Sequence, residues 1–322
     1  MHVTKRSFSG ILVAIALGAA AGDALAQAYP SGPIKFIVPR GPGGGSDTIA
    51  RLVAPGVSEK LGAPVQIENR PDATAVLGAE LVAQAKPDGH TFYISDNSFY
   101  QNPAVLPKVP YDTVKDFTGV TMFAQGPVVL IVHPAVPANT LKELLQLAKN
   151  KDLSYASGGI GSSTHLVGVM VNLKGGVNMT HVPFKGSGPA LNALLGNHVS
   201  MQYGGLSSAL PHIQKGSVKA IATTGTARHK SIPDVPTFTE AGLPDVDVPS
   251  VWGIHAPAGT PLDVRRKMRE AIVATMKEPG VAARMQEMGY EMIGNTPEEH
   301  QRQTEKIVST WLDVGKRVSL RE

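Results

Sequence analysis

Cysteine is absent from this chain of 322 residues, and only 5% of its residues are aromatic and 17% charged. The absence of cysteine excludes disulfide bonds and thiolate chemistry, so the fold depends on its hydrophobic core. The ten histidines show no metal-ligand spacing, and neither H-E-x-x-H nor G-x-S-x-G occurs. No basic tract with interleaved aromatic residues occurs either. The sequence therefore favours neither a metalloenzyme nor a nucleic-acid partner, and we predict no cofactor.

The N-terminus carries the pattern of an export signal. Lys5 and Arg6 precede the apolar run GILVAIALGAAAG, and the small residues at 24–26 follow it. A basic start, a short apolar run and an A-x-A site are typical of a secretory signal peptide, whereas a membrane span needs roughly 18 apolar residues. We therefore predict that residues 1–26 form a signal peptide, cleaved near Ala26, and that the mature protein is periplasmic. The alternative is a membrane anchor.

Short apolar runs alternate with helical patterns along the rest of the chain, which is long enough for two domains. The runs are continuous rather than alternating, as expected of strands that helices cover on both faces. This order predicts an α/β protein with mainly parallel sheets. The predicted strands cover residues 34–39, 64–69, 91–96, 128–134, 153–157, 180–184, 199–203 and 218–224.

Residue patterns also predict where several helices begin. Serine, threonine and aspartate are preferred at the N-cap, and proline is favoured at the first helical position. Glutamate three residues after the cap completes a capping box. On these grounds we predict N-caps at Ser46 or Asp47, Thr140, Ser187, Thr260 and Thr296.

The segment PRGPGGGSDTIAR, residues 39–51, places three consecutive glycines between a predicted strand and a predicted helix. Free backbone N–H groups at a helix N-terminus, with no side chains in the way, form an anion site. The segment has neither the Gly-Lys-Ser/Thr of a Walker A loop nor the glycine spacing of a dinucleotide fingerprint. It therefore predicts either an anion site or a turn that only brings strand and helix together. The predicted ligand-binding residues here are Gly43, Gly44, Gly45 and Ser46, with Asp47 as the cap.

A second segment, YASGGIGSSTHLVG at 155–168, again runs from a strand through glycines and hydroxyl residues into a helix. His165 would lie in the first helical turn, where a packing role is favoured over ligand contact. Two such helix starts predict two lobes that hold one anion between them. The predicted ligand-binding residues of this segment are Gly159, Gly161, Ser162 and Ser163.

Other polar residues follow the ends of predicted strands, the edge at which an α/β fold collects its ligands. Lys185 and Ser187 lie two residues apart, but this spacing matches no nucleophile motif, so it does not predict catalysis. The further predicted ligand contacts are Asn97, Lys185 and Tyr203, with Asn69 and Thr74 as additional candidates.

Taken in order along the chain, these segments resemble the Bug family of extracytoplasmic solute receptors, which serve tripartite tricarboxylate transporters. The resemblance covers nearly the whole mature chain, and the order of the motifs is more specific than any one of them. It rests on PSGPIKFIVPRGPGGGSDTIARLVAPGVSEKLGAPVQIENRP, AKPDGHTF, VPYDTVKDFTGVT, LKELLQLAK, YASGGIGSSTHL, HVPFKGSGPALNALLGNHV, ALPHIQKGSVKAIATTGTARHKSIPDVPTFTEAGLPDV and WGIHAPAGTP.

The resemblance implies a type II periplasmic binding-protein fold, in which crossing strands join two α/β lobes around a ligand cleft. We expect the first lobe at 27–125 plus 252–322 and the second at 126–251. In the family the ligand is mostly a small carboxylate, which the receptor delivers to the permease subunits of its transporter. By the family pattern, the loops at 43–47 and 158–163 bind the carboxylate. We expect a monomer without enzymatic activity.

Two stretches depart from the family pattern. DATAV at 72–76 stands where a glycine-rich turn is usual, which would stiffen this loop and reshape the pocket. Arg40 stands where an aromatic residue is more common. This arginine could contact an anionic ligand, but we favour an ion pair with Asp72 or Asp47, because surface arginines more often form solvated pairs.

Two other functions remain open at this point. A signalling receptor would use the same lobes to present a ligand-dependent surface to a sensor. A periplasmic hydrolase would use Ser162, Ser163 or Ser187 together with His165 or His181. The absence of a nucleophile motif makes the hydrolase the weaker alternative.

Overall fold

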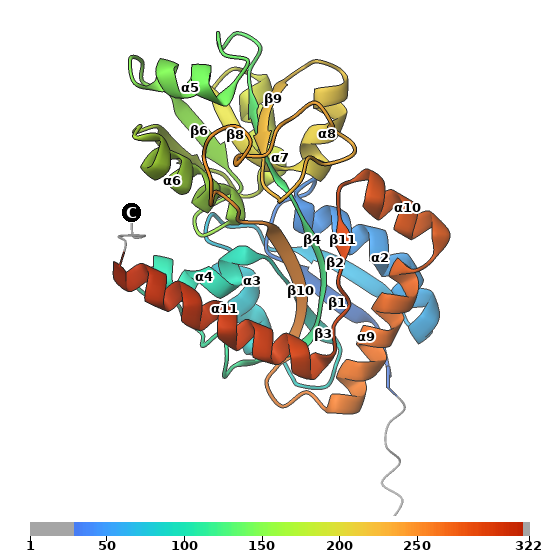
Figure 1. Cartoon of the computed structure of the whole chain (residues 1–322). Helices are drawn as coiled ribbons and strands as arrows, with labels where there is room; N and C mark the ends of the chain where they lie inside the picture. The colour runs from blue at the N-terminus through green and yellow to red at the C-terminus, as the bar shows by residue number, and fades with distance from the viewer. Residues whose placement is uncertain (1–28, 318–322) are drawn as a thin grey trace, which may run out of the picture.

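The computed structural model describes residues 29–317, which fold into two α/β lobes, one above the other in Figure 1. The predicted signal peptide, residues 1–26, lies outside the described residues. Among residues 29–317, no helix combines the length and the apolar character that a membrane span needs.

The first lobe contains a six-stranded sheet. In the order in which they pair, its strands are β11 (Glu291–Met292), β4 (Phe117–Gly126), β10 (Ser250–Pro257), β3 (Thr91–Ser95), β1 (Ile34–Val38) and β2 (Val65–Asn69). Its helices are α2 (Gly45–Leu61), α3 (Val76–Ala83), α4 (Asn97–Val105), α9 (Leu262–Met276), α10 (Pro279–Glu287) and α11 (Pro297–Arg317).

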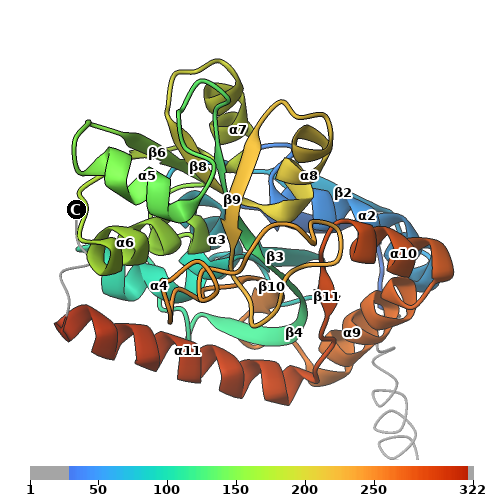
Figure 2. The same cartoon turned by 45° about the horizontal axis from the view of Figure 1, so that its top comes forward.

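Successive side chains of β1 point to opposite faces of the sheet, so the lobe has a hydrophobic core on each face. Phe36 packs in a cluster with side chains of α2 and α9, whereas the next residue, Ile37, packs with side chains of α3 and α4. Helix α11 lies on the α4 face and extends toward the second lobe, where Trp311 packs against its core (Figure 2). Both faces of the sheet are therefore covered, as the continuous apolar runs predict.

The second lobe contains a five-stranded sheet. Its strands pair in the order β7 (Thr180–Pro183), β6 (Ser154–Ser157), β8 (Met201–Gly205), β5 (Val128–Val132) and β9 (Lys219–Thr223). Its helices are α5 (Leu141–Ala148), α6 (Ser163–Gly175), α7 (Ser187–Leu195) and α8 (Leu206–Gln214). Helices α5 and α6 share one core cluster with the sheet, and α7 and α8 share another.

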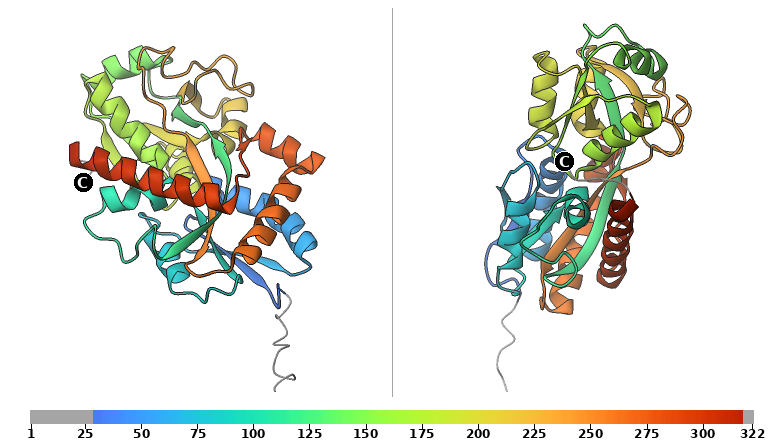
Figure 3. Two further views of the ribbon diagram at one scale, coloured as in Figure 1. Left: turned by 60° about the horizontal axis from the view of Figure 1, so that its bottom comes forward. Right: turned by 90° about the vertical axis from the view of Figure 1, so that its left-hand side faces the viewer.

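Two long strands carry the chain between the lobes (Figures 1 and 3). Strand β4 ends at Gly126 and β5 begins at Val128, while β10 brings the chain back from the second lobe. The two crossing strands pair antiparallel over their length, from Ser250 opposite Gly126 to Pro257 opposite Phe117. The two lobes are therefore joined by two strands whose backbones are hydrogen-bonded to each other.

The eight predicted strands are all present, with ends that differ by at most two residues. The prediction of mainly parallel sheets is wrong, because β10 pairs antiparallel with β3 and β4, and β5 with β8 and β9. Strands β4 and β10 were not among the predicted strands. A strand that leaves a lobe and a neighbour that returns to it must run in opposite directions, so the crossing produces the antiparallel pairs.

Two predicted capping sites are confirmed. Thr140 caps α5 by accepting a hydrogen bond from the N–H of Glu143 at 3.2 Å. Thr296 accepts from the N–H of Glu299 at 3.2 Å, and the Glu299 carboxylate accepts from the N–H of Thr296 at 2.8 Å. The second pair completes a capping box, with Pro297 at the first helical position of α11.

Three predicted caps are wrong by one to three residues. Helix α2 begins at Gly45 with Gly44 as its extended N-cap, and α7 begins at Ser187 with Gly186 before it. Helix α9 begins after Pro261, since the Thr260 hydroxyl donates to the Pro257 carbonyl at 2.7 Å. A glycine adopts the required N-cap conformation without a side chain, so both glycine-preceded helices start earlier than their hydroxyl residues indicate.

Two histidines form a buried pair in the first lobe, with His255 on β10 and His300 on α11. Their ring centroids lie 4.4 Å apart and neither side chain is exposed. Burial lowers the pKa of His300 to about 3, and burial followed by the neighbouring His300 lowers the pKa of His255 well below its usual range. Both rings are therefore neutral at neutral pH, and protonating them opposes folding.

We expect the free energy of unfolding to fall as the pH is lowered from about 6.5 to 5. The unfolded chain takes up a proton on each ring near its ordinary pKa, whereas the folded chain does not, so each ring contributes up to about 1.4 kcal/mol per pH unit. Urea unfolding across this range measures the slope. The His300→Gln variant should show a clearly shallower slope, and an unchanged slope would contradict the assignment.

Candidate functional site

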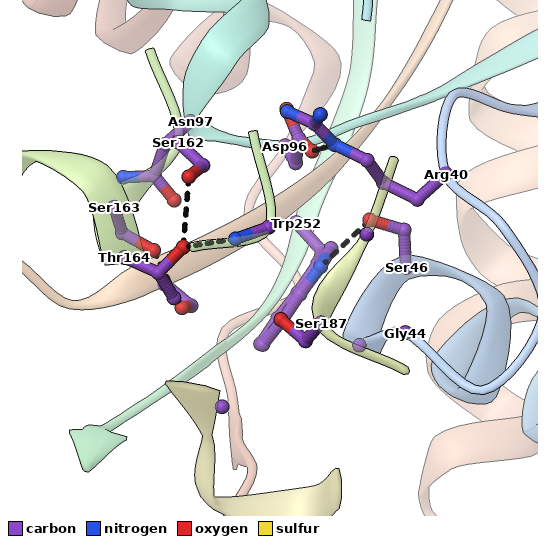
Figure 4. A pocket seen from close by; sticks show the side chains of 15 residues that line it. Arg40, Gly44, Ser46, Asp96, Asn97, Ser162, Ser163, Thr164, Ser187 and Trp252 are labelled. Atoms are coloured by element: carbon purple, nitrogen blue, oxygen red, sulfur yellow. Dashed lines mark hydrogen bonds and ion pairs between the residues drawn. The ribbon is translucent and has the colours of Figure 1, made fainter. Parts of the chain in front are cut away.

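Five helices begin around one cavity between the lobes: α2 and α4 from the first lobe, and α6, α7 and α8 from the second. The cavity, whose lining side chains Figure 4 shows, is small, with a volume of about 40 Å³. The lining residues are Arg40, Gly44, Gly45, Ser46, Asp96, Asn97, Gly158, Ser162, Ser163, Thr164, Gly186, Ser187, Gly205, Ser250 and Trp252.

The sheets explain why these helices start together. Strands β1 and β3 run parallel in the first lobe, as do β6, β7 and β8 in the second, so their carboxyl ends share an edge in each sheet. Each of these five strands is followed by one of the five helices. The cavity therefore lies at the carboxyl edges of both sheets, where open α/β folds collect ligands.

Three of the five helices carry a glycine N-cap without a side-chain hydrogen bond: Gly44 for α2, Gly186 for α7 and Gly205 for α8. The first N–H groups of a helix have no partner within the helix and carry partial positive charge. No side chain caps these three helices, so the N–H groups at the starts of α2 and α7 stay available to a ligand, whereas the first N–H of α8, that of Leu206, donates to the Pro127 carbonyl at 3.2 Å. A carboxylate is the kind of group that such helix starts bind.

The second-lobe loop from Gly158 to Thr164 is held by its own hydroxyl groups. Ser162 accepts from the N–H of His165 at 3.2 Å and donates to the Gly159 carbonyl at 2.6 Å. Thr164 Oγ1 accepts from the N–H of Gly158 at 2.9 Å. The loop is therefore rigid before any ligand binds. His165 is buried and stacks on His181 at 4.2 Å between ring centroids, which confirms the predicted packing role.

Trp252 on β10 forms one wall of the cavity. Its indole Nε1 donates to Ser46 Oγ at 3.1 Å, and its ring lies against the start of α2. A Cβ atom on Gly45 would lie 2.5 Å from this ring, so the close packing of helix and indole requires glycine at this position. Ser250, two residues before Trp252 on the same strand, shares a hydrogen bond of 2.7 Å with Ser163 of the second lobe. The crossing strand therefore supplies an aromatic wall and a hydroxyl group.

Arg40 is buried, and its ion pair is not the predicted one. Its side chain is 5% exposed, and its Nε donates to the Asp96 carboxylate at 2.7 Å. Its terminal nitrogens donate to Ser98 Oγ and to the backbone carbonyls of Asp72 and Ala73. The prediction of a surface pair with the Asp72 or Asp47 carboxylate is therefore wrong. The buried partner of Arg40 is Asp96, at the N-cap of α4. The sequence did not indicate this pair because the two residues are far apart in the chain.

Asp47 holds the first glycine loop in place from the side that faces away from the cavity. Its carboxylate accepts from Arg51 Nε at 2.9 Å, from Asn69 Nδ2 at 2.9 Å and from the N–H of Gly43 at 3.1 Å. Burial would raise the pKa of Asp47, but these hydrogen bonds outweigh it, so the pKa lies below its usual range. Asn69 also donates to the Arg40 carbonyl at 2.8 Å. Both residues therefore position the loop, and the carboxylate does not line the cavity.

The loop at 72–76, which departs from the family pattern, is held by several hydrogen bonds. The Asp72 carboxylate accepts from the N–H groups of Val76 and Leu77 at the start of α3. The Thr74 carbonyl accepts from Asn102 Nδ2 at 2.7 Å. Ala73 presents its carbonyl to Gly159 across the cleft. The loop thus forms part of the contact between the lobes rather than part of the cavity wall.

The fourteen predicted ligand-binding residues divide into two groups. Those that line the cavity are Gly44, Gly45, Ser46, Asn97, Ser162 and Ser163, and those that do not are Gly43, Asp47, Asn69, Thr74, Gly159, Gly161, Lys185 and Tyr203. The Lys185 side chain is exposed, and its carbonyl accepts from the N–H of Gly41 at 2.9 Å. Tyr203 is fully buried in the core of the second lobe.

Sequence reasoning missed several lining residues, and some had a visible signal. Gly186 and Ser187 stand at a strand end followed by a helix, the same pattern as the two recognised loops. Trp252 begins the quoted motif WGIHAPAGTP. Gly205 and Ser250 carry no such local signal. Within the described part of the chain, no group of three or more acidic or histidine side chains is placed to hold a metal ion.

Hydrogen bonds across the cleft show that the lobes are closed. The N–H of Gly41 donates to the Lys185 carbonyl at 2.9 Å, and Ser98 Oγ donates to the Ile160 carbonyl at 3.4 Å. A ligand of several heavy atoms enters only if the lobes part about the crossing strands, as in hinged binding proteins.

Residues 49–318 match the family described as "Tripartite tricarboxylate transporter family receptor". The chain is 35% identical to the UPF0065 protein in the tcbD-tcbE intergenic region of Pseudomonas sp. (strain P51), over 91% of this chain and 88% of that protein.

Two solved structures share the two-lobe fold. The periplasmic binding protein BugD superposes with a TM-score of 0.87 at 32% identity, over 91% of this chain and all of that one. MatC from Rhodopseudomonas palustris with bound malate gives a TM-score of 0.83 at 33% identity, over 89% and 100% of the two chains. The predicted type II periplasmic binding-protein fold is confirmed. The resemblance to Bug proteins is confirmed as well, and the chain belongs to the tripartite tricarboxylate transporter receptor family of periplasmic solute-binding proteins.

Proposed function

We propose that this receptor captures a small carboxylate in the periplasm and delivers it to the permease subunits of a tripartite tricarboxylate-type transporter. The observation that carries the proposal is the meeting of five helix N-termini around one cavity. Three of them lack a side-chain cap, and two of these, α2 and α7, leave backbone N–H groups for an anion.

The charge balance of the cavity supports an anionic ligand. Arg40 and Asp96 are the charged residues among the lining side chains in the described part of the chain, and they neutralise each other at 2.7 Å. The counter-charge for a carboxylate therefore comes from helix N-termini rather than from a free cation. Such a site holds any carboxylate of suitable size, and the hydroxyl groups with the Trp252 ring select among them.

Several details of this function are part of the proposal. The ligand contacts come from the cavity-lining residues of the two glycine loops, with Asn97. The remaining predicted residues support those loops. The mature chain begins near Gln27 and acts as a monomer, with lobes at 27–125 plus 252–322 and at 126–251. Parting of these lobes admits the ligand, and their closure excludes water and strengthens the hydrogen bonds.

The hydrolase alternative is dropped, because the family consists of solute-binding receptors rather than enzymes. A signalling receptor would use the same closed form, so the cavity alone does not favour it over transport. We favour transport because the matching family is named for the receptor of a transporter.

A thermal-shift screen on refolded, ligand-free mature chain tests the proposal. The panel contains malate, citrate, aspartate and benzoate, one probe for each class of carboxylate. A ligand at a hundred times its Kd stabilises the folded state by about 2.7 kcal/mol, which gives a clear shift in Tm. We expect one class of carboxylate to raise the Tm. The same ligand should change the tryptophan fluorescence of the protein, and this change should be lost in Trp252→Phe and retained in Trp311→Phe. Folded, ligand-free protein that responds to no carboxylate would contradict the proposal.

A further inference from the structure

Tyr290 joins the two lobes behind the ligand cavity. It follows α10 and precedes β11 in the first lobe, and it is 7% exposed. Its hydroxyl donates to Ser207 Oγ at 2.7 Å. Ser207 lies in the first turn of α8 in the second lobe, two residues after the N-cap Gly205, which lines the cavity. This hydrogen bond therefore crosses from one lobe to the other.

The same tyrosine supports the cavity wall from behind. Its ring lies 4.9 Å from the Trp252 ring, centroid to centroid, at an interplanar angle of 66°. Its hydroxyl oxygen lies 3.4 Å from the carbonyl oxygen of Gly45, at the start of α2. Trp252 in turn donates to Ser46, and both line the cavity. Tyr290 is thus in contact with the first-lobe half of the site and hydrogen-bonded to the second lobe.

Backbone around Tyr290 fits closely at the junction of the lobes. A Cβ atom on Gly126, the last residue of β4, would lie 3.1 Å from the Tyr290 ring. A Cβ atom on Gly289 would lie 2.7 Å from Leu206 of α8, and Gly289 has a φ of +77°. Glycine at both positions permits this approach. The turn therefore packs against the second lobe at the point where the first crossing strand ends.

The Tyr290 hydroxyl is protonated whenever the protein functions. Burial raises its pKa above the ordinary value, and the hydrogen bond with Ser207 offsets only part of that rise. The group is therefore a hydrogen-bond donor over the physiological pH range.

We propose that Tyr290 is a closure latch, a positioning residue whose hydrogen bond to Ser207 forms only when the lobes close and holds them on the ligand. This inference rests on the proposed function. Parting of the lobes breaks the Tyr290–Ser207 bond, whereas the contact with Trp252 stays within the first lobe. The latch therefore stabilises the closed form without contributing a direct contact to the ligand.

The Tyr290→Phe variant of the mature chain tests the latch, because it removes the hydroxyl and keeps the ring on Trp252. One hydrogen bond is worth about 1 kcal/mol, so we expect the Kd for the carboxylate identified in the panel to rise about fivefold. The change should appear in the dissociation rate, with the association rate unchanged, since the bond forms after ligand entry. Ser207→Ala should have the same effect, and the double variant should be no weaker than either single one.

Tyr29→Phe is the matched control. The Tyr29 hydroxyl donates to the Gly89 carbonyl at 2.9 Å, and both residues belong to the first lobe. The Tyr29→Phe variant also loses a tyrosine hydroxyl, but from a hydrogen bond that does not cross the cleft. Its Kd should equal that of the wild type, and an equal rise in this control would assign the effect to general destabilisation and overturn the latch.

The absence of native cysteine allows a second measurement that needs no identified ligand. Fluorophores on Lys86→Cys and Lys142→Cys, exposed in the first and second lobes, report the distance between the lobes. Tyr290→Phe should lower the closed fraction with and without the panel carboxylate. Wild-type protein that binds a carboxylate, together with unchanged Kd and closed fraction in the variant, overturns the latch and leaves the proposed function standing. If the wild type binds none of the panel, the proposed function fails, and the closed fraction of the ligand-free variant alone decides on the latch.

Discussion

Replacing Arg40 with methionine is expected to lower the free energy of unfolding by about 3–5 kcal/mol. The substitution leaves the Asp96 carboxylate, whose side chain is 12% exposed, without the cation that neutralises it at 2.7 Å. An unpaired buried charge costs far more than the loss of an exposed pair. Urea unfolding of the ligand-free chain measures the effect. A loss of less than 1 kcal/mol would show that Asp96 is well solvated and that the pair is not structural.

Two further variants separate charge burial from the loss of side-chain volume. Arg284→Met removes one partner of a pair that is exposed on both sides, since the Arg284 and Glu287 side chains are 59% and 64% exposed, and it should change stability by no more than about 1 kcal/mol. Arg40→Met combined with Asp96→Asn should recover much of the lost stability. Asparagine keeps the N-cap bond that Asp96 accepts from the N–H of Ser98, and it removes the unpaired charge.

Replacing Gly159 with alanine is expected to raise the Kd for the carboxylate by a hundredfold or more. In the closed form, a Cβ atom at this position would overlap the Ala73 carbonyl oxygen and Arg40 Nη1, both in the first lobe. When the lobes part, these two overlaps disappear and only a 3.0 Å contact with the Phe184 carbonyl of the same lobe remains, so the clash opposes closure more than folding. A hundredfold change corresponds to about 2.8 kcal/mol, within the range for overpacking a tight contact. Titration of the variant with the carboxylate from the panel measures it.

The backbone conformation of Gly159 needs a control of its own, because its φ of +126° also disfavours alanine. Gly176 in the same lobe has a φ of +61°, and nothing lies within 4 Å of a Cβ placed there. Gly176→Ala should therefore destabilise the fold by about 1 kcal/mol through backbone strain and leave the Kd unchanged. If both alanine variants bind as the wild type does, the two lobes do not meet at Gly159 in the bound state.

Local features of the sequence were sufficient to predict eight strands and two helix caps of this fold. Each predicted strand is an apolar run bounded by turn residues, and each confirmed cap is a hydroxyl with a glutamate three residues on. The two glycine loops could be predicted to meet at one site because strand, glycine turn and helix start are consecutive in the chain, and residues of both loops line the cavity. The order of these motifs was also enough to indicate the family, which the comparisons confirm.

The crossing strands were harder to predict because their partners are distant. Strand β10 pairs with β4, more than a hundred residues earlier, and only this pairing places Trp252 and Ser250 at the cavity. The Arg40–Asp96 pair likewise joins residues 56 positions apart. A local pattern contains no information on such contacts.

Tyr203 shows how a small shift in a strand changes the predicted site. The predicted strand ended at Tyr203, which would put this side chain at the cavity edge, but β8 continues to Gly205. Tyr203 therefore lies inside the strand and points into the core, while Gly205 reaches the cavity. The sequence by itself determined the strand-turn-helix units and the family, because these depend on neighbouring residues. The tertiary structure decided which residues meet at the cavity, because that depends on where each strand ends and which distant strand lies beside it.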